Sequence, residues 1–99
     1  MNVSVQVITP EQWNQMSHDP NTILIDLRSP EEYRQSHIPK AINIPYEHLR
    51  KIVFYRRKKL VLYCGQGIRS TAAAMFLAEH GYRVATLQGG LDAWMRYNG

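Results

Sequence analysis

The segment from Lys59 to Glu79 constrains the fold of this chain more than any other. It contains an apolar run at 59–63, a short loop with two glycines, and a run over 70–79 that is rich in alanine. The apolar run has the length of a buried strand, and the second run consists of strong helix formers. We therefore predict a strand, a tight loop and a helix. Cys64, the one cysteine of the chain, is the first residue of that loop.

The same alternation of strands and helices extends along the rest of the chain. Thr9 and Ser29 each precede a proline, and Gln12 and Glu32 follow three residues after them. Both patterns are typical of a helix start with a capping box. Apolar runs predict five strands, at 3–8, 22–27, 41–44, 59–63 and 84–87. Helices are predicted at 10–16, after Ser29, at 46–52, at 70–79 and after the turn at 89–90. This order indicates an α/β fold, a single domain over 1–99 with a mainly parallel five-stranded sheet and helices on both faces.

Cys64 lies where a thiol can become a nucleophile. In a parallel sheet, ligands bind beyond the carboxyl ends of the strands, and Cys64 follows such an end. Unpaired N–H groups at the start of the next helix favour a thiolate. Gly65 and Gly67 allow the backbone to curl these groups toward the sulfur, and Arg69 adds a positive charge. The alternative is that a lone cysteine serves as a small buried hydrophobic residue.

The length of the loop distinguishes two chemistries. Four residues, 65–68, separate Cys64 from Arg69. Such a loop can hold a phosphate or a smaller anion. Protein tyrosine phosphatases carry one residue more between cysteine and arginine, so the shorter loop favours a single sulfur atom. Three function classes remain open here: a sulfurtransferase, a phosphatase or arsenate reductase, and a sulfur-carrier or binding module with little turnover.

Composition restricts the compartment and the partners. A single cysteine cannot form an internal disulfide, so we expect a cytoplasmic protein. We expect no membrane partner, because no stretch approaches the roughly 20 apolar residues of a membrane span and no signal peptide is visible. The net charge is +4, and six of the twelve basic residues lie between Arg50 and Lys59. The run 56–59 lacks the interleaved aromatics of a nucleic-acid binder, so we expect no nucleic-acid partner. Instead we predict a solvated loop that keeps the Cys64 site electropositive.

Four sequence blocks together resemble the rhodanese family of sulfurtransferases, over nearly the whole chain. They are 25–28 with Glu32 and Tyr33, 37–45, 64–70 and 87–94. The resemblance implies a parallel five-stranded α/β sheet and an active-site loop that runs from Cys64 to Arg69. Four positions depart from the family pattern, none of them in the loop. Ser36 and Lys40 replace glycines, and Leu87 and Leu91 replace aromatic residues.

The resemblance also implies a cysteine that accepts sulfane sulfur as a persulfide and passes it on. Cys64 is then the catalytic nucleophile. The substrate-binding residues are Gly65, Gln66, Gly67, Ile68, Arg69 and Ser70. The donor is a small molecule such as thiosulfate. The acceptor is cyanide in an assay, or an external thiol or protein in the cell, because the chain has no second cysteine to resolve a persulfide. No cofactor and no metal are expected, and the oligomeric state stays open.

Three more residues invite catalytic roles. Asp26 and Arg28 could act as an acid and a substrate clamp. We expect them to be structural instead, with Asp26 accepting backbone hydrogen bonds and Arg28 paired with Glu32. His37 could act as a base, but it precedes an Ile-Pro bend and has no second ligand candidate nearby, so we expect no direct role.

Overall fold

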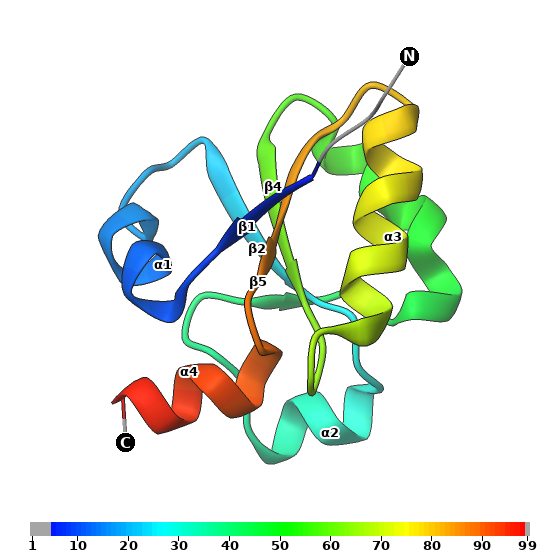
Figure 1. Ribbon diagram of the computed structural model, residues 1–99. Coiled ribbons are helices and arrows are strands. Elements are labelled where there is room, and N and C mark those ends of the chain that lie inside the picture. Colours follow the sequence, from blue (N-terminus) through cyan, green and yellow to red (C-terminus); the bar gives the residue numbers. More distant parts are fainter. Residues whose placement is uncertain (1–4, 99) are drawn as a thin grey trace.

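The computed structural model describes residues 5–98. Its sheet has five strands in the order β1-β5-β4-β2-β3, and each neighbouring pair is parallel (Figure 1). The strands are β1 (Gln6–Ile8), β2 (Thr22–Asp26), β3 (Ile42–Asn43), β4 (Lys59–Tyr63) and β5 (Arg83–Leu87). The helices are α1 (Pro10–Met16), α2 (Pro30–Gln35), η1 (Tyr46–Tyr55), α3 (Ile68–Glu79) and α4 (Gly90–Asn98).

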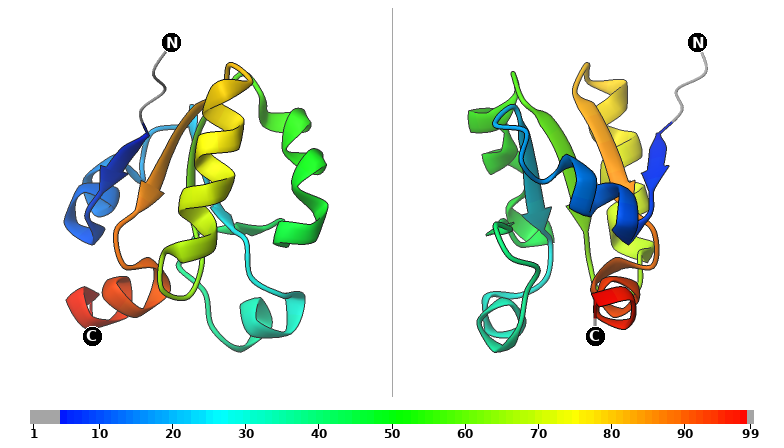
Figure 2. Two further views of the ribbon diagram at one scale, coloured as in Figure 1. Left: turned by 45° about the vertical axis from the view of Figure 1, so that its right-hand side comes forward. Right: turned by 90° about the vertical axis from the view of Figure 1, so that its left-hand side faces the viewer.

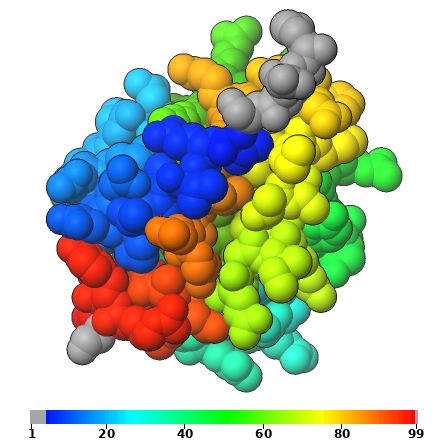
Figure 3. Space-filling view, viewed as in Figure 1, coloured from blue at the N-terminus to red at the C-terminus, as the bar shows by residue number. Residues whose placement is uncertain are grey.

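Both faces of the sheet are covered, as the α/β prediction requires. Along the central strand β4, Val61 and Tyr63 pack in a cluster with residues of α1 and α4. Leu60 and Leu62 pack in a second cluster with residues of η1 and α3. The left view of Figure 2 shows α1 on one side of the sheet and α3 with η1 on the other. On the first face α4 lies against α1 (Figure 3).

The capping boxes predicted for the first two helices are both present. In α1, Thr9 Oγ1 accepts the Gln12 N–H at 3.1 Å, and Gln12 Oε1 accepts the Thr9 N–H at 2.8 Å. In α2, Ser29 and Glu32 make the equivalent pair of bonds at 3.2 Å each. Each box provides acceptors for two backbone N–H groups that a helix start would otherwise leave unpaired.

Element boundaries differ from the prediction in several places. Residues 3 and 4 of the first predicted strand lie outside the described residues, and β1 begins at Gln6. Strand β3 has two residues instead of four. The helix predicted at 46–52 is a 3₁₀ helix that extends to Tyr55. Helix α3 begins at Ile68 instead of Ser70. Among the helices in residues 5–98, none is long and apolar enough to cross a membrane.

The carboxyl ends of β2 and β4 lie side by side, since Asp26 pairs with Tyr63 in the register. The loops that follow them lead to α2 and to Cys64, at the end of the sheet where Figure 1 also shows α4.

The basic run of residues 56–59 lies at the other end of the sheet, because Lys59 begins β4. The five residues of β4 separate the basic run from Cys64 by about 16 Å, which is twice the Debye length of roughly 8 Å at physiological salt. The prediction that this run keeps the Cys64 site electropositive is therefore wrong.

Candidate active site

Cys64 follows β4 directly and its side chain is buried, with 5% of its surface exposed. The Gly67 N–H donates to Cys64 Sγ at 3.2 Å, and Ser70 Oγ lies 3.8 Å from the same sulfur. The chain can return to its own sulfur within three residues because Gly67 adopts a φ of +98°, in the left-handed region that glycine tolerates. The loop is thus folded around the sulfur atom.

Two opposing effects set the acidity of the Cys64 thiol. Burial of the sulfur raises its pKa, because the charged form loses hydration. Hydrogen bonds from the backbone and hydroxyl of Ser70 and from the N–H groups of Gly67 and Arg69 outweigh burial. The pKa of Cys64 therefore lies below its ordinary value. The charge of Arg69, which the sequence suggested as a cause, is not among these leading contributions.

This arrangement predicts that the rate of Cys64 alkylation rises with pH at a midpoint below that of a free thiol. Ser70→Ala removes the hydroxyl that favours the thiolate, so the midpoint should move upward. Arg69→Ala, which keeps its backbone N–H, should move it less. Iodoacetamide labelling across a pH series, read by intact mass, checks both shifts. A wild-type midpoint at or above that of a free thiol would contradict the stabilising role of the loop.

A cavity of about 280 Å³ opens beside the sulfur. Its lining includes five predicted site residues, namely Cys64, Gly65, Gln66, Ile68 and Arg69. The other two, Gly67 and Ser70, do not line the cavity and contact the sulfur instead. The structure therefore brings the predicted loop together, with five of its residues lining the cavity and two against the sulfur. Two residues of the second predicted block, Arg28 and Glu32, also line the cavity.

Arg28 is held by Asp26, and not by Glu32 as predicted. Its Nη2 donates to Asp26 Oδ2 at 2.8 Å, and its Nε donates to Oδ1 at 3.1 Å. Asp26 also accepts the Arg28 backbone N–H at 2.8 Å, which confirms the expected backbone role of this carboxylate. Glu32 instead caps α2 through Ser29. A carboxylate that is fully buried needs the charge partner more than an exposed one does.

Tyr63 completes this network and was not singled out from the sequence. Its hydroxyl donates to Asp26 Oδ2 at 2.6 Å and accepts the Ile38 N–H at 3.1 Å. Burial, and then the hydrogen bond to Asp26, raise the pKa of Tyr63 far above its ordinary value, so the hydroxyl stays protonated. Because Tyr63 precedes Cys64, the network fixes the end of the strand that leads to Cys64.

The start of α4 holds the loop from the other side. The Leu91 N–H donates to the Cys64 carbonyl at 2.9 Å, and the Asp92 N–H donates to the Gly65 carbonyl at 3.2 Å. Gly90 permits this contact, because a Cβ at that position would lie 2.2 Å from the Cys64 carbonyl oxygen. The sequence showed a Gly-Gly turn here but gave no sign that it touches the loop.

Comparison with known proteins agrees with this geometry. The sequence matches the rhodanese-like domain family over residues 9–97. The chain belongs to this family. A thiosulfate:glutathione sulfurtransferase of Saccharomyces cerevisiae is 34% identical over an alignment of 98 positions, gaps included, that covers 83% of this chain and 70% of the yeast protein. A rhodanese-related protein of Thermoplasma volcanium has a similar structure, with a TM-score of 0.83 and 29% identity, covering 93% of this chain and 92% of that one.

Rhodanese-like sequences also occur within larger proteins. A tRNA uridine(34) hydroxylase of Hamiltonella defensa is 31% identical over an alignment of 100 positions, gaps included, that covers 92% of this chain. The match spans 28% of that hydroxylase, so most of the hydroxylase has no counterpart here.

His37 lies outside the cavity of this rhodanese-like domain. Its ring stacks on Tyr33 at a centroid distance of 3.8 Å, and its Nδ1 lies 2.7 Å from the Tyr33 carbonyl oxygen. The ring is thus engaged in a local contact away from Cys64. Among the described residues, no group of three or more His, Cys, Asp or Glu side chains could hold a metal ion.

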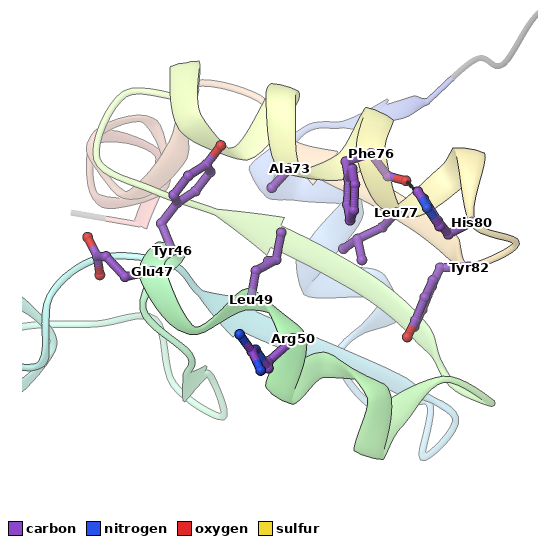
Figure 4. Close-up of a pocket in the computed structure, with 9 residues that line it drawn as sticks. All are labelled: Tyr46, Glu47, Leu49, Arg50, Ala73, Phe76, Leu77, His80 and Tyr82. Carbon is purple, nitrogen blue, oxygen red and sulfur yellow. Dashed lines mark hydrogen bonds between the residues drawn. The ribbon is translucent and has the colours of Figure 1, made fainter.

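A larger, apolar groove of about 550 Å³ lies between η1 and α3 (Figure 4). Its walls include Leu49 from η1 and Ala73, Phe76 and Leu77 from α3. The groove shares no lining residue with the cavity beside Cys64 and contains no cysteine. The groove therefore lies apart from the predicted nucleophile, Cys64.

Proposed function

We propose that this domain is a sulfurtransferase that moves sulfane sulfur from a donor such as thiosulfate to a thiophilic acceptor through a persulfide on Cys64. The observation that carries the proposal is a buried cysteine whose pKa is lowered by the N–H groups and hydroxyl of its own loop. Membership of the rhodanese-like family and the name of the yeast relative support the same chemistry.

In the first half-reaction, the Cys64 thiolate attacks the outer sulfur of thiosulfate. The sulfur–sulfur bond of the donor breaks and sulfite leaves with the bonding electron pair. The terminal sulfur remains on Cys64 as a persulfide, with the negative charge that the thiolate brought. We expect the loop N–H groups that favour the thiolate to stabilise this anion as well, as an oxyanion hole does.

In the second half-reaction, an acceptor thiolate or cyanide attacks the terminal sulfur. The persulfide bond breaks and Cys64 leaves as a thiolate. The acceptor is an external small thiol, cyanide or a protein, since the chain contains no other cysteine. Neither a cofactor nor a metal takes part in this scheme. The proposed setting is the cytoplasm, without a nucleic-acid or membrane partner.

Intact mass after incubation with thiosulfate tests the proposal. We expect the mass to increase by one sulfur atom and to return to its starting value after addition of cyanide. A protein that never gains this mass does not accept sulfur from thiosulfate, which would contradict the proposed first half-reaction. Multiple turnover in a thiosulfate:cyanide assay separates the enzyme from a carrier that is loaded once.

Besides the short loop, the lack of a proton donor among the described residues of the cavity disfavours phosphatase chemistry. Phosphate ester hydrolysis needs a general acid to protonate the leaving group. The hydrogen bonds from Ser29 hold the pKa of Glu32, the one carboxyl that lines this cavity, below its ordinary value. Glu32 is therefore ionised at neutral pH and cannot donate a proton.

We accordingly expect the protein to turn over thiosulfate and to show negligible hydrolysis of aryl phosphates. Parallel assays with thiosulfate and with 4-nitrophenyl phosphate, each at saturating substrate and neutral pH, check this difference. Hydrolysis of the phosphate ester as fast as sulfur transfer would overturn the assignment.

A further inference from the structure

The mouth of the Cys64 cavity carries a carboxylate as well as a cation. Glu32, from the first turn of α2, lines the cavity together with Arg28, Arg69 and the sulfur itself. Glu32 completes the capping box of α2, and its charge also adds to the potential that a molecule entering the cavity meets. The presence of Glu32 therefore bears on which molecules react there.

The carboxylate is held in place at one end. Glu32 Oε1 accepts hydrogen bonds from the Ser29 N–H at 3.2 Å and from the Ser29 hydroxyl at 3.0 Å. The bonds from Ser29, and more weakly the charges of Arg28 and Arg69, keep the pKa of Glu32 below its ordinary value. Glu32 thus presents a fixed negative charge at the mouth of the cavity.

The charge of the neighbouring arginine is already matched. Arg28 forms an ion pair with Asp26 at 2.8 Å, the one such pair within residues 5–98. Two opposite charges, on Arg69 and Glu32, then remain for a small molecule that enters the cavity. Such a mouth has a positive and a negative side rather than a uniform potential.

We infer that Glu32 is a specificity-determining residue that selects the sulfur acceptor by charge. It favours thiols that carry an ammonium group near the sulfur and disfavours thiols that carry a carboxylate. The inference rests on the proposed function. In the step concerned, the acceptor thiolate forms a bond to the terminal sulfur, the persulfide bond breaks, Cys64 leaves as a thiolate, and the acceptor becomes a persulfide.

The test compares three acceptors of similar size and different charge: cysteamine, 2-mercaptoethanol and 3-mercaptopropionate. The Cys64 persulfide is formed with thiosulfate, excess donor is removed, and the loss of the added sulfur is followed by rapid-quench intact mass. Glu32→Gln removes the charge and keeps the cap, because Gln12 completes the equivalent capping box in α1. Dividing the variant rate by the wild-type rate for each thiol cancels the nucleophilicity of that thiol.

We expect Glu32→Gln to lower the rate of sulfur transfer to cysteamine about two- to fivefold and to raise the rate to 3-mercaptopropionate by a similar factor. These factors correspond to the free energy of an exposed charge pair. The rate to 2-mercaptoethanol should not change. Glu31→Gln is the matched control, since it removes the same charge one residue away, outside the Cys64 cavity. It should change none of the three rates.

Equal rate ratios for the three thiols, or the same pattern in Glu31→Gln, would overturn the inference. Salt supplies a second test. The effect of Glu32→Gln on the rates with cysteamine and with 3-mercaptopropionate should shrink in about 1 M salt, where the Debye length falls to roughly 3 Å. An effect of Glu32→Gln that does not change with salt contradicts a role for its charge. Failure of the wild type to form a persulfide would refute the proposed function itself, which is a different result.

Discussion

Replacing Cys64 with serine is expected to abolish persulfide formation and to lower thiosulfate:cyanide activity below about 1% of the wild-type rate. A serine hydroxyl is neutral at pH 7 and no other group in the cavity is positioned as a base for it, because Glu32 is already engaged with Ser29. The Gly67 N–H, now 3.2 Å from the sulfur, can donate to the new oxygen instead. The loop should therefore keep its shape while the nucleophile is lost.

Circular dichroism and thermal unfolding of Cys64→Ser are the controls for this experiment, and both should match the wild type. Ser70→Ala provides a second comparison. It leaves the nucleophile in place and should reduce the rate at neutral pH much less than Cys64→Ser does. A correctly folded Cys64→Ser protein that retained more than a few per cent of the activity would show that the nucleophile lies elsewhere.

Gly90→Ala is expected to damage the site from outside the loop. The new Cβ would lie 2.2 Å from the Cys64 carbonyl oxygen and 2.8 Å from the Gly65 carbonyl oxygen, and Gly90 has a φ of +61°. The overlap and the backbone strain together should lower the free energy of unfolding by about 2–4 kcal/mol. Because the backbone of the loop must shift, sulfur transfer should fall about a hundredfold, the scale of a 1 Å misplacement of a reacting group.

Gly81→Ala is the matched control for the backbone term. Gly81 also has a positive φ, +88°, but a Cβ there would meet nothing within 4 Å. This variant should lose about 1–2 kcal/mol of unfolding free energy and keep its activity per folded molecule. Chemical denaturation and the thiosulfate:cyanide assay measure the two quantities. Full activity in Gly90→Ala would show that the loop does not depend on its contact with α4.

Local patterns in the sequence predicted most of the fold correctly. The capping boxes at Thr9 and Ser29 place the starts of α1 and α2, because each depends on side chains three residues apart. The apolar run at 59–63 matches β4 residue for residue. The start of α3 was placed two residues late, since the left-handed turn at Gly67 depends on a contact with the sulfur.

The candidate site was predictable as a loop but not as a cavity. Residues 64–70 are consecutive, and the two glycines together with the resemblance to the rhodanese family predicted a loop that curls around the sulfur. The pairing of Arg28 with Asp26 instead of Glu32 depends on how deeply each carboxylate is buried, which the sequence does not specify. The contact of Gly90 with Cys64 joins residues far apart in the chain. Such contacts are set by the packing of α4 on the finished sheet.

The strand order has a consequence for how the molecule is assembled. The edge strand β1, which comes first in the chain, pairs with β5, which comes last among the strands. During synthesis β1 therefore has no partner strand until the residues of β5 have emerged from the ribosome, whereas β2, β3 and β4 can already pair. Helix α4, which follows β5, supplies the N–H groups of Leu91 and Asp92 that hold the Cys64 loop. Pairings between such distant segments form slowly. A nascent chain that ends before β5 therefore contains Cys64 but lacks α4, the helix that later holds the Cys64 loop. The loop gains these hydrogen bonds only after α4 has been synthesised.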